Sequence, residues 1–439
     1  MRKRTSQIPF AALLLLAVTA GSAARPGAQD KQKVDPMDRA GAEAMLMQMR
    51  DAVKQYYYDP TFHGIDMDAR YKVYLDRVKS APTLSEATRI IAAYMAGLDD
   101  SHTVFLPSRY NFRFSYDYRL QIFGDQCFLT DTRPGSDAAN KLHPGDQVLT
   151  LDGYAVTRKD LPELEYYLRA LAPHRALDFQ LREPSGKGRH EVVNTTIVDL
   201  PPVWPRSLSD YRMQSDRVQR AFRNRHTEIG DAMIWKLPSF VFGEGDIDHL
   251  VGIARKHKAL VLDLRGNWGG SAEILAYLVG SLFDHDVKLA TRVSRKGEKP
   301  VFAKSKGRGA FDGKLIVLVD SRSASAAEVL ARVVQLEHRG AVVGDRTSGS
   351  VMEATFYPFE WGFPQPFHFG AVISTANLIM GDGNSLEKVG VIPDVLLLPS
   401  ATDLVQGRDP VLSRAAEMAG VELDPAAAGK LFPYEWDEP

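Results

Sequence analysis

Three serines lie in one short segment of this 439-residue chain, Asp320-Ser321-Arg322-Ser323-Ala324-Ser325-Ala326-Ala327-Glu328. An apolar run precedes the segment, and an alanine-rich stretch with helical character follows it. A serine in such a turn lies where unpaired N–H groups and the helix dipole stabilise negative charge, as an acyl-transfer oxyanion requires. Serine is also a common helix N-cap, so the turn alone leaves a catalytic and a structural role open.

Three further segments carry residues of the same chemistry. Leu262–Gly270 places three glycines directly after an apolar run, so its loop can expose N–H groups to an oxyanion, or can be a plain strand-to-helix turn. His102 lies in a polar segment after a helical pattern and could serve a distant nucleophile. Glu387 precedes a Gly-Val-Ile-Pro turn and could orient an imidazole, although an isolated surface carboxylate is the simpler interpretation.

Composition excludes several other classes of function. The 54 basic residues nearly cancel the 55 acidic ones, so a net charge of -1 gives no support to nucleic-acid or membrane-surface binding. The single cysteine, Cys127, excludes an intrachain disulfide and a cysteine-based zinc cluster. The sequence contains no G-x-G-x-x-G, P-loop or H-E-x-x-H motif, which argues against nucleotide binding and metallohydrolase chemistry.

The N-terminus has the pattern of a secretory signal peptide. A positive start at residues 2–4 is followed by an apolar run over 9–20 and by small residues, with cleavage expected near Ala23 or Ala24. An uncleaved membrane anchor is the alternative. No later run approaches eighteen apolar residues, so we expect a soluble, exported mature protein, periplasmic or secreted, without a membrane span.

Periodicity predicts helices near the N-terminus and a β-rich unit after them. Met45, Met49, Val53 and Tyr56 share one helical face. Thr83 and Glu86 form a capping-box pattern that opens a second helix, for which Gly97 is a suitable end. Short β-like runs follow, each bounded by Pro, Gly or Asp turns, at 120–123, 147–151 and 177–181.

The second half of the chain alternates between strand and helix patterns. Strands are predicted at 259–264, 315–319 and 340–344, with helices beginning after Gly270 and over 324–336. Such alternation is typical of an α/β core with mainly parallel strands. A last helix is predicted over 409–418.

In this order, the four polar segments resemble the C-terminal-processing, or tail-specific, protease superfamily, which includes the tricorn protease core and the retinoid-binding repeats. The most specific matches are D-L-R-G-N-x-G-G at 263–270 and S-A-S-A-x-E at 323–328. The runs P-G-S-D-A-A at 134–139 and H-P-G-D-Q-V-L-T-L-D-G at 143–153 resemble its PDZ domain. The resemblance covers nearly the whole mature chain.

This resemblance implies an α/β fold with an N-terminal helical region, a PDZ-like β-rich domain and a ClpP/crotonase-like protease core. The expected order is a signal peptide at 1–24, a flexible leader at 25–36, the helical region at 37–110, the PDZ-like domain at 111–200, a connector at 201–228, the catalytic core at 229–400, and a C-terminal helix and tail at 401–439.

The resemblance also selects the nucleophile. The family's reactive serine is the second of its motif, which is Ser325, so Ser321 and Ser323 become structural. The bacterial tail-specific branch places a catalytic lysine in a T-F-G-K-G segment. The corresponding residues here are 347–351, in which Ser350 stands at the lysine position, so Ser–Lys chemistry is not expected.

The tricorn-like branch instead uses a serine, a histidine and a glutamate. Its serine–histidine pair corresponds to Ser101 and His102, and its glutamate to Glu387. The resemblance therefore implies that Ser325 attacks the peptide carbonyl and that His102 acts as general base and then as general acid to the leaving amine. Glu387 or Ser101 would orient His102.

The remaining expectations concern the oxyanion hole and the partners. The N–H of Ala326 and one from Gly269 or Gly270 would form the hole, and Trp268 would wall the cleft or pack on the following helix. Substrates are expected to be proteins or peptides, recognised in part by a chain end that adds a strand to the PDZ-like unit, with no cofactor and no metal. A catalytically silent peptide- or lipid-binding relative is the alternative function. The oligomeric state stays undetermined.

Overall fold

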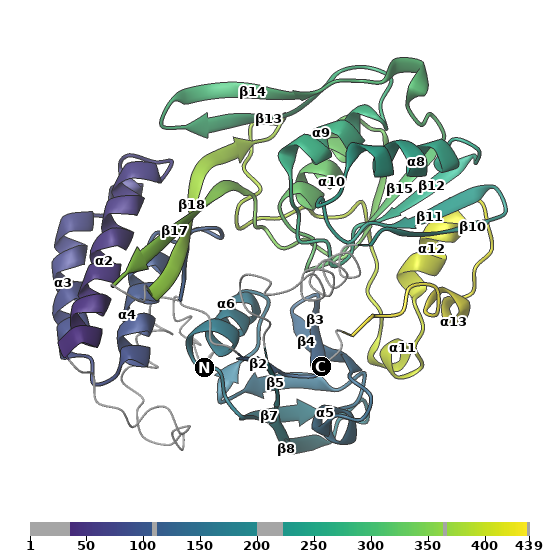
Figure 1. Ribbon diagram of the computed structural model, residues 1–439. Coiled ribbons are helices and arrows are strands. Elements are labelled where there is room, and N and C mark those ends of the chain that lie inside the picture. The colour runs from purple at the N-terminus through teal and green to yellow at the C-terminus, as the bar shows by residue number, and fades with distance from the viewer. Residues whose placement is uncertain (1–35, 108–111, 200–222, 363–366, 437–439) are drawn as a thin grey trace, which may run out of the picture.

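The computed structural model describes residues 36–107, 112–199, 223–362 and 367–436. The predicted signal peptide and nearly all of the predicted leader lie outside these ranges. Figure 1 shows three parts, namely the helices α2 to α4 on one side, a layered sheet with helices on the other, and a small β-rich unit below both. The mixture of helices and sheets is that of an α/β protein, as predicted.

A six-stranded sheet forms the centre of the largest part. Its order is β10 (Arg225–Ile229), β11 (Ala232–Lys236), β12 (Ala259–Asp263), β15 (Lys314–Val319), β16 (Gly340–Gly344) and β19 (Val395–Leu396). All neighbours pair in parallel except β10 and β11, which are antiparallel. The mainly parallel core is therefore confirmed, and each strand predicted there is present within a residue or two.

Helices cover both faces of this sheet (Figure 1). One face packs against α8 (Glu244–Ala254), α9 (Ala272–Gly280) and α10 (Ala326–Leu336), and the other against α12 (Pro410–Met418) and α13 (Pro425–Ala428), with α11 (Ala401–Val405) nearby. Leu260 and Leu262 belong to the first core and Val261 to the second, because successive side chains of a strand point to opposite faces.

The N-terminal helices pack on a second sheet. They are α2 (Pro36–Tyr56), α3 (Met67–Ser80) and α4 (Leu84–Ala96), with one 3-10 turn at Phe62–Gly64. The sheet contains β1 (Val104–Leu106), β13 (Val287–Ser294), β14 (Gly297–Ala303), β17 (Met352–Trp361) and β18 (Phe367–Ile379). The predicted face of α2 is confirmed, since Met45, Met49 and Val53 are buried. Thr83 caps α4 by accepting from the Glu86 N–H.

The β-rich unit is a separate sheet with its own core. Its order is β3 (Tyr118–Phe123), β4 (Gln126–Thr132), β5 (Gln147–Leu151), β7 (Ala176–Arg182) and β8 (Gly188–Asn194), with β6 (Tyr154–Ala155) beside β5, while β2 (Phe112–Ser115) pairs with β9 (Thr196–Asp199). Two helices complete it, α5 (Asp137–Lys141) and α6 (Leu161–Tyr166), the latter continuing as a π-helical turn over Tyr167–Leu171. Strand β3 is at the edge of the sheet and faces the catalytic core.

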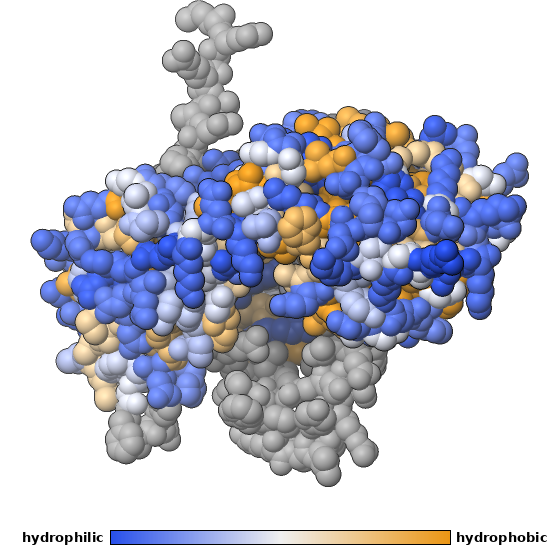
Figure 2. Space-filling view, turned by 90° about the horizontal axis from the view of Figure 1, so that it is seen from above, coloured by the Kyte–Doolittle hydropathy of each residue, from blue (hydrophilic) through white to orange (hydrophobic). Residues whose placement is uncertain are grey.

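The predicted connector is too long at its C-terminal end. Residues 225–228 belong to β10, because this polar segment pairs with β11 at the edge of the central sheet and needs no apolar face. Residues 200–222 lie outside the described ranges. Within those ranges, no helix combines the length and the apolar character needed to cross a membrane. The face seen in Figure 2 is largely hydrophilic, with apolar residues in separate patches.

Candidate active site

Ser325 occupies a strained position at the N-terminus of α10. Its φ of 55° and ψ of -118° lie in a region that side-chain-bearing residues rarely adopt, and such strain is typical of functional turns. As the residue before the first turn of the helix, it precedes the unpaired N–H groups there. The β15 strand and α10 therefore place Ser325 at the carboxyl end of the central parallel strands, where α/β proteins bind ligands.

The buried Glu328 carboxylate holds this turn in place. One oxygen accepts from the backbone N–H of Ser325 (3.0 Å) and of Ser350 (2.9 Å). The other accepts from the N–H of Gly349 (2.7 Å) and the hydroxyl of Thr347 (2.6 Å). Burial raises the pKa of Glu328 to about 7, while these hydrogen bonds oppose the shift. The carboxylate thus ties the serine turn to segment 347–350.

The glycine loop after β12 lies directly against Ser325. A Cβ on Gly269, whose φ is +97°, would come within 2.6 Å of the Ser325 Cβ. Only glycine permits this approach. The Gly269 N–H donates to Asn267 Oδ1 (2.8 Å), whereas no hydrogen bond within the described residues engages the N–H of Gly270 or of Ala326. Of the two expected glycine donors, the geometry therefore favours Gly270.

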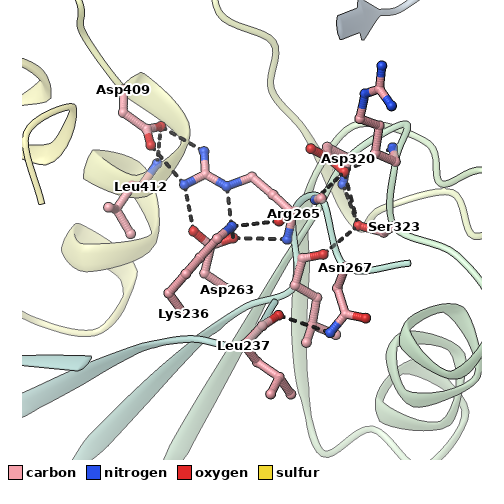
Figure 3. Close-up of polar contacts among 12 residues, drawn as sticks. Lys236, Leu237, Asp263, Arg265, Asn267, Asp320, Ser323, Asp409 and Leu412 are labelled. Atoms are coloured by element: carbon pink, nitrogen blue, oxygen red, sulfur yellow. Dashed lines mark hydrogen bonds and ion pairs between the residues drawn. The ribbon is translucent and has the colours of Figure 1, made fainter. Parts of the chain in front are cut away.

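A polar cluster at the end of β12 fixes the start of this loop (Figure 3). The Arg265 guanidinium bonds Asp263 (2.8 Å) and Asp409 (2.8 Å), and Lys236 pairs with Asp263 at 3.2 Å. The two cations hold the pKa of the buried Asp263 carboxyl well below its usual range, although burial opposes them. Asp409 also caps α12, so the cluster links the loop to the C-terminal helices.

Asn267 and Asp320 connect the glycine loop to the serine turn. The Asn267 side-chain amide donates to Leu237 O (2.9 Å), and the backbone carbonyl of Asn267 accepts from the Ala324 N–H (2.8 Å). Asp320 accepts from the Gly266 N–H at 2.9 Å. These contacts set the distance between the loop and the turn before any substrate binds.

The other two serines of the turn are structural, as expected. Ser323 is fully buried, donates to Leu264 O (2.8 Å) and accepts from the Asp320 N–H (3.0 Å). Ser321 donates to Ile122 O at 2.7 Å, on strand β3. Neither hydroxyl is left for catalysis.

His102 belongs to a hydrogen-bonded chain that ends on a glutamate. The Ser101 hydroxyl lies 2.7 Å from His102 Nδ1 and donates to Glu387 Oε2 (2.8 Å). Glu387 Oε1 accepts from the Ser101 N–H (2.7 Å), and Oε2 also accepts from the Val351 N–H (2.8 Å). The structure thus brings together Ser101, His102 and Glu387, with Ser101 as the direct partner of the imidazole.

Burial and one acidic neighbour set the charge of this group. Burial lowers the pKa of His102, and the charge of Asp100 opposes that shift. Burial raises the pKa of Glu387, while its bonds to Val351 and Ser101 oppose it. A neutral imidazole at neutral pH is the form that a general base requires.

Asp100 fixes the backbone around His102. It accepts from the N–H groups of His102 (2.9 Å) and Thr103 (2.7 Å) and from the Ser374 hydroxyl (2.8 Å). The turn between α4 and β1 is thereby tied to β18 of the second sheet. Its position therefore depends on how the N-terminal helices pack on that sheet.

Two adjacent residues connect the serine and the histidine groups. The Ser325 N–H donates to Ser350 O (2.9 Å), and the next residue, Val351, donates to Glu387. The Ser325 hydroxyl and the His102 imidazole are not hydrogen-bonded to each other in this structure, and catalytic bonds in resting sites are often long. Ser350, at the position of the lysine in the other branch, bonds Ser348 Oγ at 2.8 Å.

Three residues with clear roles here were not predicted from the sequence. Glu328 appears in the sequence as the last residue of the S-A-S-A-x-E motif. Its spacing of three residues from Ser325 is that of a capping box, which could have indicated its role. Asp100 stands two residues before His102, where an aspartate commonly accepts N–H bonds of a turn. Asn267 is part of the D-L-R-G-N-x-G-G motif, but its role had no local signal, because the partners Leu237 and Ala324 lie far away in the sequence.

Two parts of the chain match the sequence models of known peptidase domains. Residues 236–397 match the sequence model of peptidase family S41, and residues 38–96 match the tricorn protease C1 domain. A carboxyl-terminal-processing protease of Synechocystis sp. is 24% identical over 369 residues, which cover 80% of each chain.

Solved structures show the same fold. The photosystem II D1 C-terminal processing protease superposes with a TM-score of 0.54 at 21% identity, covering 89% of this chain and 99% of that one. Mature CPAF gives a TM-score of 0.63 at 15% identity, covering 84% and 94%. The chain is a serine-type peptidase. It contains a peptidase S41 domain and a tricorn protease C1 domain.

Proposed function

We propose that this peptidase cleaves peptide bonds through an acyl-enzyme on Ser325. The Ser325 hydroxyl attacks the scissile carbonyl carbon as its proton passes to His102 Nε2, and the carbonyl oxygen becomes an oxyanion. The N–H groups of Ala326 and Gly270 donate to that oxygen. The C–N bond then breaks as His102 returns the proton to the leaving amine, and water hydrolyses the ester by the same steps.

One observation carries this proposal, namely the strained Ser325 at a helix N-terminus with two unengaged N–H groups around it. The Ser101–Glu387 pair supports the role of His102, because a hydroxyl on Nδ1 that is itself bonded to a carboxylate fixes the ring and stabilises its cation. Ser101 thus lies between the imidazole and the carboxylate, where a direct contact is more usual.

We further propose that residues 111–200 form a PDZ-like unit whose main task is to hold the serine turn. Arg322, three residues before the nucleophile, donates to Leu120 O (2.7 Å) and pairs with Glu165 (2.8 Å). The Ser321 hydroxyl donates to the backbone carbonyl of Ile122, two residues further along the same edge of β3. Strand addition by a substrate chain end at β3 would require both side chains to leave. We also propose that the protein is exported to the periplasm or secreted, because its N-terminus has the pattern of a signal peptide.

The test is the intact mass of the protein after reaction with a serine-reactive fluorophosphonate. We expect one adduct on the wild type, placed on Ser325 by peptide mapping, and none on Ser325→Ala. Ser348→Ala serves as the control, because this nearby serine bonds only Ser350 through its hydroxyl, and it should label like the wild type. An adduct on a different serine, or none on folded wild type, would contradict the proposal.

A further inference from the structure

A cavity of about 530 Å³ lies beside the glycine loop. Its walls come from the outer face of β3, from the loop after β12 and from the C-terminal segment, and they include Arg119, Phe123, Trp268, Phe432 and Tyr434. The cavity adjoins the β3 edge that Ser321 and Arg322 occupy, since Gln121 lines the cavity and its amide donates to Ser321 Oγ at 2.7 Å. Leu120 and Ile122 instead belong to the core of the β-rich unit.

Most charges around this cavity are neutralised by partners. Lys236 and Arg265 both pair with Asp263, Arg265 also pairs with Asp409, and Arg408 pairs with Asp403. Arg223 and Arg225 both pair with Glu435 of the C-terminal segment, at 2.7 Å and 3.7 Å.

Among the described basic residues that line the cavity, Arg119 is the exception. Its guanidinium lies over the Tyr434 ring, 3.9 Å from the centroid, and forms neither a hydrogen bond nor an ion pair with any other described residue. Asp131 is opposite Arg119 in the β3–β4 register, but the two are not paired. Burial lowers the pKa of Arg119. The charges of Asp131 and Asp320 oppose this shift without forming an ion pair with Arg119. A desolvated guanidinium without a directly bonded carboxylate is unfavourable, so this position favours an anion in the cavity.

Trp268 links the cavity to the glycine loop of the candidate active site. This side chain is 51% exposed, lines the cavity, and immediately precedes Gly269, the residue in contact with Ser325. Consecutive Cα atoms are about 3.8 Å apart, so the cavity begins within a residue or two of the loop that approaches the nucleophile. An extended chain bound at Ser325 can therefore pass over Trp268 and reach Arg119.

We propose that Arg119 and its cavity form a subsite for a carboxylate of the peptide substrate. The carboxylate belongs to an acidic side chain or to the chain's C-terminus, a few residues from the scissile bond. A planar guanidinium held by an aromatic ring offers paired N–H donors to a carboxylate and discriminates against an amide of the same shape. This inference rests on the proposed peptidase function and deepens it by naming a class of substrate.

The test measures peptide binding without turnover, in a Ser325→Ala background. Three fluorescein-labelled ten-residue peptides of one sequence are compared by anisotropy. The first carries one Glu and an amidated end, the second replaces Glu with Gln and has a free C-terminal carboxylate, and the third has Gln and an amidated end. We expect at least one carboxylate peptide to bind roughly 10-fold more tightly than the neutral one.

Substitution then assigns the preference to Arg119. Arg119→Gln should abolish the difference between the peptides, whereas Arg182→Gln, which removes the same charge from an exposed position on β7, should preserve it. The thermal midpoints of the variants show whether they are folded. Preference for the Glu peptide indicates a side-chain subsite, and preference for the free end indicates chain-end recognition.

Equal binding of all three peptides, a preference that survives Arg119→Gln, or no binding at millimolar protein would each overturn the inference. None of these results bears on Ser325, whose fluorophosphonate reaction is measured on the wild type. The subsite and the proposed nucleophile therefore fail separately.

Discussion

The serine half and the histidine half of the candidate site are built in different ways. Ser325 and the glycine loop follow β15 and β12, two neighbouring parallel strands, so their closeness comes directly from strand pairing. His102 follows a helix of the N-terminal region, and its neighbour Ser101 bonds Glu387 across 286 positions of sequence. One half is fixed by the sheet, and the other by hydrogen bonds between loops.

This difference teaches where the site is rigid and where it can be perturbed. The serine turn has a strained backbone, a four-bonded carboxylate and a close glycine, all within one packed core. The histidine turn depends on Asp100, Ser101 and Glu387, whose bonds join separate loops and are partly exposed. Substitutions in the first half should therefore damage both reactivity and stability, and those in the second mainly reactivity.

Apart from removal of the proposed base itself, the largest effect should follow Gly269→Ala. The new Cβ would press on the Ser325 Cβ and would require a side chain at a φ of +97°. We expect fluorophosphonate acylation to slow by roughly 10²–10³-fold, comparable with the loss of an oxyanion donor. Gly266→Ala is the matched control, because its φ is +71° but its Cβ would meet nothing within 4 Å. Equal loss in both variants would show that backbone strain alone is responsible.

A smaller effect is expected for Glu387→Gln. Glu387 Oε2 accepts from both the Ser101 hydroxyl and the Val351 N–H, and an amide nitrogen in its place could accept neither bond. The Ser101–His102 pair would therefore lose its orientation. Acylation should slow by roughly 10- to 100-fold, with the thermal midpoint nearly unchanged. Asp99→Asn, which breaks an exposed pair with Lys388 next to the same turn, should have no effect. A large drop in midpoint for Glu387→Gln would indicate a structural role instead.

The rate of fluorophosphonate acylation should decline on the acid side, with a midpoint below pH 6.5. Burial lowers the pKa of His102 from 6.5, so the neutral base persists to lower pH and acylation declines only once the solution pH falls through that lowered value. Below it, the rate should fall about tenfold per pH unit. The measurement is the acylation rate constant from pH 4.5 to 8. A midpoint near 7 would instead assign the limb to Glu328, whose pKa burial raises to about 7.

The smallest effect should come from Glu165→Gln in the β-rich unit. Arg322 would lose a partner at 2.8 Å but keep its bonds to Leu120 O, and both side chains are partly exposed at 34% and 23%. We expect acylation to change only a few-fold and the free energy of unfolding to fall by about 1 kcal/mol. Glu417→Gln, from an exposed pair with Arg414, is the control and should change neither. A loss of acylation beyond 100-fold would show that the β-rich unit controls the serine turn more directly.

The contrast between the halves also explains what the sequence could predict. The order of strands and helices around Ser325 was predictable, because apolar runs alternate with helical patterns and the glycine loop follows a strand. The sheet of β17 and β18 was not, since its long strands mix exposed and buried residues without a simple period. His102 and Glu387 could be selected only through the family motifs, because nothing local indicates that their turns meet. The placement of Ser101 between them, and the pairing of Arg322 with β3, arise entirely from tertiary contacts.

The most direct test of the central claim is the rate of fluorophosphonate acylation of Ser325 in His102→Ala, compared with the wild type at pH 8. If His102 is the general base for Ser325, the rate constant should fall by roughly 10⁴-fold or more, while the thermal midpoint stays within a few degrees. His257→Ala is the control, because this histidine pairs with Glu228 away from the site and should label like the wild type. Acylation of His102→Ala within tenfold of the wild-type rate would contradict the account and show that Ser325 is activated by another group.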